Sequence, residues 1–187
     1  MTTLIIVVVV VVLLVIAYAV MYNGLVQLRT HAQESWSQMD VQLQRRNDLI
    51  PNLVSTVKGY SKYEASTLEK VTTLRQQMVN LPEGDHAKLM EVSNQLSASL
   101  RSIFAVAENY PDLKASTEYQ QLIEELSNTE NKIAYSRQLY NSTVAALNAR
   151  IQSFPTNIVA HLHHFTQMDY LQVPKESKQV PKVSFDD

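Results

Sequence analysis

Three histidines near the end of the chain are the side chains best suited to chemistry. His161, His163 and His164 lie within four positions of one another, and imidazole nitrogens bind zinc and nickel. Neighbouring positions on a helix project in different directions, however, and no acidic residue lies at a suitable offset. Two readings stay open: a metal site, which would allow a metal-dependent enzyme, or the polar surface of a terminal helix, which we favour.

A second polar group lies beside an apolar seam. Glu130 and Arg137 are seven residues apart, or two helical turns, so they share one face of a helix. Such charges need partners when buried and then tend to fix register. A substrate or proton site and a solvated pair are the other readings. The expected polar layer holds Glu130, Asn131, Arg137 and Tyr140, with Arg46 or Asp48 opposite.

The remaining candidates are interpreted as structural or interaction residues. Arg45 and Arg46 lie about 30 Å of helix beyond the apolar N-terminus, so a helix-end or packing role is favoured over contact with lipid headgroups. Trp36 stands at a core position and packs there or contacts a partner. The sequence has no Ser-His-Asp, paired-carboxylate, HExxH or phosphate-loop pattern and no cysteine. We therefore expect no catalytic residue, no bound metal and no cofactor.

Composition predicts an all-α protein. The 187 residues carry a formal net charge of −2, which gives no basic field for nucleic acid. Only three glycines occur, too few for the turns of an all-β fold. Low glycine and proline content with abundant Leu, Gln, Glu, Ser and Ala favours long helices.

The N-terminus predicts a transmembrane helix. Residues 4–16 are all aliphatic, and the uncharged stretch continues to Tyr22. Residues 4–21 would span about 27 Å as a helix, close to the ~30 Å of a bilayer core. In lipid every backbone group needs an internal partner, so the valine run becomes helical. Tyr18 and Tyr22 then fall at the membrane interface.

A cleaved signal peptide is the competing reading, because Ala17-Tyr18-Ala19 has the form of a cleavage site. No Lys or Arg precedes the apolar run, so the positive region of a signal peptide is missing and a permanent anchor is favoured. Arg29 and later basic residues follow the run. The positive-inside rule therefore predicts an outer N-terminus and a cytoplasmic C-terminal domain.

Apolar residues then recur every three or four positions in four segments, which predicts an antiparallel, coiled-coil-like four-helix bundle. Pro51 should end the first helix, with Asp48 capping the next; three helices result if Pro51 only kinks the first. A turn is expected at residues 82–85, a helix end at Pro111 and an N-cap at Thr117. The stripe of the first segment is Leu25, Leu28, Ala32, Trp36, Met39 and Leu43.

The predicted domains are a transmembrane anchor at residues 1–22, the helical bundle at 23–155, and a C-terminal region at 156–187. The last region combines a short amphipathic helix with an extended or disordered tail.

Several segments have a distinctive sequence. They are Asn23-Gly24-Leu25-Val26-Gln27-Leu28-Arg29, the run from Arg45-Arg46-Asn47-Asp48-Leu49-Ile50-Pro51 to Val54, Glu108-Asn109-Tyr110-Pro111, Asn128-Thr129-Glu130-Asn131 and Phe154-Pro155-Thr156-Asn157. Together these segments resemble the LemA family. The resemblance covers the chain from the apolar run to about Ala160. It departs at residues 161–165, where the family usually carries a Gly/Phe-rich stretch.

The resemblance implies a bacterial inner-membrane protein with a cytoplasmic helical bundle. By analogy, a membrane metalloprotease or a TPM-domain protein is a possible partner. We expect a single-pass membrane scaffold or adaptor that contacts the lipid bilayer, forms a homo-oligomer or recruits partners through helix faces, and binds no nucleic acid. A membrane-linked sensor or regulator of a neighbouring protease is the alternative; only residues 1–3 would lie outside as its input.

Overall fold

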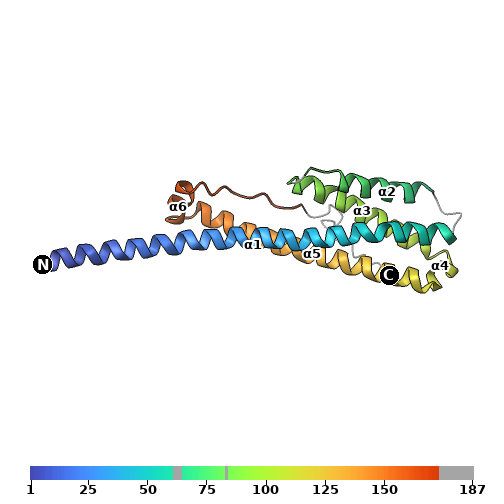
Figure 1. Cartoon of the computed structure of the whole chain (residues 1–187), viewed down its shortest axis with the longest axis horizontal. Coiled ribbons are helices and arrows are strands. Elements are labelled where there is room, and N and C mark those ends of the chain that lie inside the picture. The colour runs from blue at the N-terminus through green and yellow to red at the C-terminus, as the bar shows by residue number, and fades with distance from the viewer. Residues whose placement is uncertain (61–64, 83, 173–187) are drawn as a thin grey trace, which may run out of the picture. The chain divides into compact units, whose positions relative to one another are not determined.

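The computed structural model describes residues 1–60, 65–82 and 84–172, and within these ranges it contains helices and no strand. The predicted all-α fold, with one long apolar N-terminal helix followed by further helices, is confirmed. The predicted tail at residues 173–187 lies outside the described residues. The helices are α1 (Thr2–Tyr60), α2 (Ala65–Val79), α3 (His86–Ala107), α4 (Pro111–Ala115), α5 (Thr117–Gln152) and α6 (Thr156–Leu162) (Figure 1).

The first part of α1 is exposed and apolar. The side chains of residues 4–16 are 49–72% exposed, although each is aliphatic. Aliphatic side chains favour removal from water, so a surface of this kind is typical of an interaction or membrane-contacting segment. Helix α1 is long and apolar enough to cross a membrane, by length and composition alone.

The predicted helix break at Pro51 is wrong, because α1 passes through Pro51 and continues to Tyr60. Proline has no N–H, so the Asn47 carbonyl four residues earlier loses its helical partner. The structure supplies a replacement: Arg75 of α2 donates its Nε–H to the Asn47 oxygen over 3.0 Å. Asp48 therefore lies inside α1 and caps no helix.

The chain divides into two compact units, each described by itself. The first unit comprises residues 1–40 and 134–170, so it contains the first part of α1, the second part of α5, and α6. One apolar cluster in this unit is built on Leu25 of α1, Leu147 of α5, and Val159 and Ala160 of α6. The partly buried residues packed against it are Met21, Tyr22, Leu28, Ile151, Phe165 and Met168.

The second unit comprises residues 41–133 and 171–187. Its described core takes apolar side chains from α1, α2, α3, α4 and α5. Helices α2 and α3 follow one another in the chain and lie side by side (Figure 1). The largest fully buried side chains of this unit, at under 2% exposure, are those of Leu43, Ile50, Leu53, Met90, Leu96, Ile103, Leu113 and Ile133, together with the charged Arg46.

Local signals set the helix starts. Asp85 accepts the Lys88 N–H at 3.0 Å and so caps α3. The cap of α5 is Ser116, whose hydroxyl accepts the Tyr119 N–H at 3.4 Å, so the prediction of Thr117 was one residue late. Pro111 begins the short helix α4 because its missing N–H is tolerated at a first helical position.

Helix α6 ends in a Schellman motif at the histidines. The Phe165 N–H donates to the Ala160 carbonyl at 2.9 Å, and the His164 N–H donates to the His161 carbonyl at 3.2 Å. His164 has a φ of 54°, the left-handed conformation that this motif requires. The backbone at His164 is therefore used to end a helix.

Candidate functional site: a buried arginine in a polar layer

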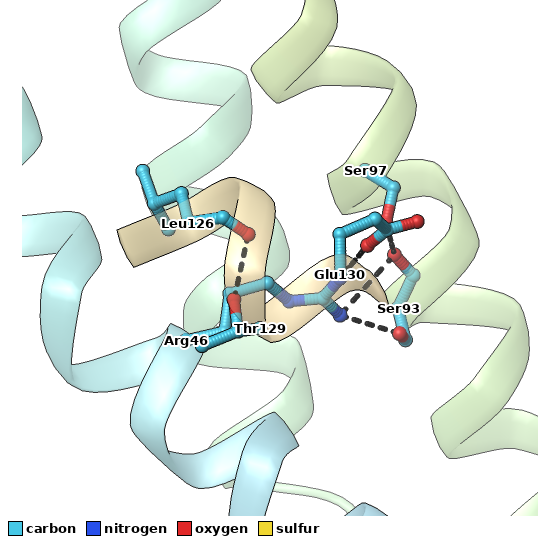
Figure 2. A network of polar contacts seen from close by, with 6 residues as sticks. All are labelled: Arg46, Ser93, Ser97, Leu126, Thr129 and Glu130. Carbon is cyan, nitrogen blue, oxygen red and sulfur yellow. Dashed lines mark hydrogen bonds and ion pairs between the residues drawn. The ribbon is translucent and has the colours of Figure 1, made fainter. Parts of the chain in front are cut away.

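Arg46 is the most deeply buried charged residue that the structure describes, at 1% exposure. Its Nη1 donates to the Glu130 carboxylate at 2.7 Å and to the Ser97 hydroxyl at 2.8 Å. Its Nη2 donates to the Ser93 hydroxyl at 2.5 Å. Figure 2 shows the guanidinium pointing into this group from α1, with the two serines on α3 and Glu130 on α5.

Sequence spacing explains why these side chains meet. Arg46 follows Leu43 by three positions and precedes Ile50 by four, and both neighbours are buried, so Arg46 stands on the core stripe of α1. Ser93 and Ser97 are one turn apart on α3, between the buried Met90 and Leu100. Their small side chains leave room for the guanidinium, and both hydroxyls are hydrogen-bonded to it.

The carboxylate is less buried than its partner. The Glu130 side chain is 39% exposed, whereas that of Arg46 is 1% exposed. Glu130 also accepts a hydrogen bond from the Ser97 hydroxyl at 2.8 Å. The ion pair therefore lies at the edge of the core, where the acid keeps contact with water and the base does not.

This arrangement suits pairing of helices. Each charge has an opposite charge and additional hydrogen bonds, which offset the cost of removing it from water. A guanidinium that needs serines from α3 and a carboxylate from α5 is satisfied in only one alignment of α1, α3 and α5. We interpret the Arg46 layer (Arg46, Ser93, Ser97 and Glu130) as a device that fixes this alignment.

The structure separates the other predicted members of the layer. Asn131 and Asp48 are exposed. Arg45 points elsewhere than its neighbour, because it pairs with Glu125 at 3.3 Å with both side chains about half exposed. Sequence reasoning missed Ser93 and Ser97. The available signal was their position on α3, where both serines lie on the same face as the apolar residues Met90 and Leu100.

Arg137 and Tyr140 belong to the first unit, and both are buried. The Tyr140 ring packs edge-on against Trp36, with ring centroids 6.3 Å apart, and its hydroxyl donates to the Asp169 carbonyl at 3.3 Å. Burial raises the pKa of Tyr140, and the nearby Asp169 charge raises it further. Trp36 is thus partly buried against α5.

A second polar contact in this unit was not foreseen. Asn148 of α5 donates its Nδ2–H to the Met168 carbonyl at 2.9 Å and accepts the Met168 N–H on Oδ1 at 3.0 Å. The side-chain amide therefore satisfies both backbone groups of one residue, as a neighbouring strand would. This pair of bonds holds the segment after α6 to α5.

Aromatic rings gather where α6 meets α1. Tyr18 Oη and His163 Nε2 share a hydrogen bond of 2.5 Å. The His163 ring also lies 4.6 Å from the Tyr22 ring, centroid to centroid. Tyr22 in turn contacts Phe165, with centroids 6.1 Å apart. His163 thus bridges to the two tyrosines predicted for a membrane interface.

The histidines have roles other than a shared ligand set. His163 contacts tyrosines, and His164 adopts the left-handed conformation after α6. Within residues 1–60, 65–82 and 84–172, no group of three or more His, Asp or Glu side chains is arranged to hold a metal ion.

Comparison with known proteins places the chain in a family. The model of the LemA family matches residues 35–185. The chain is 29% identical over 143 residues to protein LemA of Metamycoplasma hominis, covering 76% of this chain and 65% of that protein. It is 24% identical over 173 residues to magnetosome protein MamQ of Magnetospirillum gryphiswaldense, covering 80% and 64%.

A similar match, 24% over 175 residues, is made to magnetosome protein MamQ 2 of Paramagnetospirillum magneticum, covering 81% of this chain and 64% of that protein. The chain therefore spans just under two-thirds of the length of these relatives. The family match extends over most of the chain, including the Arg46 layer and the turn around α6. The chain is a member of the LemA family.

Proposed function

We propose that this protein is a single-pass membrane-anchored scaffold that self-associates or recruits partner proteins through helix faces and performs no catalysis. The observation that carries the proposal is α1 itself. Its first part exposes aliphatic side chains, and the same helix continues into a packed helical body. The similarity to magnetosome protein MamQ also supports a membrane anchor.

The energetics support insertion of the apolar run. Each central aliphatic residue favours the membrane by about 0.3–0.6 kcal/mol, so residues 4–16 together contribute roughly 4–8 kcal/mol. The first charged side chain after Met1 is Arg29, so no charge within the run opposes insertion. The proposed site is the bacterial cytoplasmic membrane, with the N-terminus outside and the helical body in the cytoplasm.

The proposed docking face is an exposed part of α5. Tyr135 and Leu139 are one helical turn apart, and their side chains are 67% and 37% exposed. Aromatic and aliphatic side chains at this spacing are common anchors for a partner helix. Confinement to a membrane raises the effective concentration of such faces, so weak contacts suffice for assembly. We propose a second copy of the chain as the first occupant.

The test compares two pairs of substitutions on α5. Full-length protein is purified in mild detergent and sized, and co-purifying proteins are identified by mass spectrometry. Tyr135→Lys with Leu139→Lys should convert the assembly to monomer. The matched control, Ala145→Lys with Ala149→Lys, adds the same charge at exposed positions of the same helix and should leave assembly unchanged. A wild-type protein that is monomeric and recovers no partner would refute the scaffold.

Two further measurements complete the proposal. Protease added outside spheroplasts should leave the helical body intact; degradation would reverse the proposed orientation. Recovery of a membrane metalloprotease or a TPM-domain protein would identify the recruited partner class.

A sensor or regulator is the second candidate, favoured by the continuity of α1. One helix contains both the apolar run and Arg46, so a movement of the run could reach the Arg46 layer. A short Gly/Ser segment inserted after Gly24 would interrupt this helix. A scaffold should still recover its partners, whereas a sensor should lose its effect on a co-purifying protease.

A further inference from the structure

The turn around α6 exposes apolar side chains on one side. Ile158 and Leu162 are one turn apart on α6 and are 59% and 62% exposed, and Phe154, just before the helix, is 81% exposed. The opposite face is buried, because Thr156, Val159 and Ala160 pack into the first unit. A helix of this kind is held by one face and offers the other to a partner.

The same segment carries no permanent charge. Residues 151–168 contain no Asp, Glu, Lys or Arg, and neither do residues 2–28 of α1. These two uncharged stretches pack against each other through the cluster that contains Leu25, Val159 and Ala160. An uncharged surface next to an uncharged helix can approach lipid without removing a charge from water.

His163 fixes the level of this segment along α1. Its ring contacts Tyr18 and Tyr22, which are about 6 Å apart along the helix axis at the ideal rise. Both tyrosines lie in the last turns of the apolar run. Leu162 is the neighbour of His163 and so lies at the level where the run meets water. Leu162 thus lies beside the end of the apolar run, and Ile158 is one helical turn away from it on α6.

We propose that the α6 turn (residues 154–164) is a second membrane contact, which places Ile158, Leu162 and Phe154 in the headgroup region of a phospholipid bilayer. This proposal rests on the anchor of the proposed function, since the bilayer that α1 crosses is the one that α6 touches. Tyrosine and histidine would occupy the headgroup level, as aromatic residues with polar tips do. The lipid contact also accounts for apolar exposure that water alone would disfavour.

Single-cysteine labelling tests the proposal in the full-length chain, which has no cysteine of its own. Ile158→Cys is labelled with an environment-sensitive nitrobenzoxadiazole dye and reconstituted in phosphatidylcholine–phosphatidylglycerol vesicles. The vesicles carry a nitroxide at the headgroup or at the middle of the acyl chain. Val41→Cys is the matched control, because Val41 and Ile158 are both 59% exposed. Val12→Cys reports on the anchor.

The expected result is stronger quenching of the Ile158 label by the headgroup nitroxide than by the mid-chain nitroxide, at a depth of about 5–10 Å. The Val12 label should be quenched by the mid-chain nitroxide and the Val41 label by neither. If Val12 is quenched and Ile158 behaves like Val41, the α6 contact is wrong and the anchor stands. If Ile158 is shielded from aqueous iodide without lipid quenching, a protein covers α6 and the proposal is overturned. If Val12 escapes lipid quenching, the anchor and the α6 contact fall together.

Discussion

Adjacent arginines on α1 should differ sharply in their contribution to stability. Arg46 is buried with an ion pair of 2.7 Å, and Arg45 is half exposed with an ion pair of 3.3 Å. Substitution by Met removes the charge and keeps an unbranched apolar side chain at either position. Because both variants lose the same side chain, any difference in stability between them reflects how deeply the guanidinium is buried.

The magnitudes follow from exposure. Hydrogen bonds to charged groups contribute about 1.5–3 kcal/mol, and loss of one partner of a fully buried pair costs about 3–5 kcal/mol. Glu130 is 39% exposed and can turn toward water, so we expect Arg46→Met to cost about 2–3 kcal/mol. Arg45→Met should cost about 0–1 kcal/mol, as exposed pairs do. Glu130→Gln should cost at least as much as Arg46→Met, because the guanidinium it leaves behind cannot reach water.

Urea unfolding of the full-length protein in mild non-ionic detergent, followed by far-ultraviolet circular dichroism, measures these differences. The midpoint should fall for Arg46→Met at an unchanged slope, and the double variant Arg46→Met/Glu130→Gln should recover part of the loss of Glu130→Gln alone. Equal midpoints for Arg46→Met and Arg45→Met would refute the reasoning, since burial of the charge would then contribute nothing.

Three further outcomes are expected. Arg75→Met should lower the free energy of unfolding by about 1 kcal/mol, because the Asn47 carbonyl loses its hydrogen bond. In a Pro51→Ala background the helical hydrogen bond to Asn47 is restored, so Arg75→Met should then have little effect. An effect of the same size in both backgrounds would contradict this. His164→Gly should raise the thermal midpoint of unfolding, because glycine removes a left-handed strain of about 1 kcal/mol. A lower midpoint would show that loss of the imidazole side chain costs more than relief of this strain gains. The raised pKa of Tyr140 means that the folded protein keeps this proton when the unfolded chain loses it, so stability should fall as pH rises through and above 10. Tyr140→Phe should flatten that fall in unfolding curves recorded from pH 8 to 11, and an identical slope in both proteins would exclude Tyr140 as its source.

Much of the helical architecture is predictable because the spacing of apolar residues along a helix indicates which side chains are buried. Leu25, Ala32, Met39 and Leu43 were predicted as one stripe, and all four are buried. Periodicity is a local property of a helix, so it can be read without knowledge of its neighbours. The coiled-coil geometry and the homo-oligomer stay predictions.

The errors have a common physical source. The prediction of a break at Pro51 considered only the local cost of proline, whereas the compensating donor, Arg75, lies 28 positions away from Asn47. The predicted partners of Arg46 were likewise incomplete, because a serine in a sequence does not indicate whether it will pair with a distant arginine. Tertiary hydrogen bonds can override local preferences, and a single sequence does not reveal which distant groups will form them.

The way Asn148 holds the segment after α6 has an evolutionary consequence. Its amide recognises only the backbone N–H and carbonyl of Met168, groups that every residue except proline provides in full. This pair of hydrogen bonds therefore places no demand on the side chain at position 168, which is constrained only by its packing against the apolar cluster. One asparagine on α5 thus holds the path of this segment through backbone groups that most substitutions at position 168 would keep.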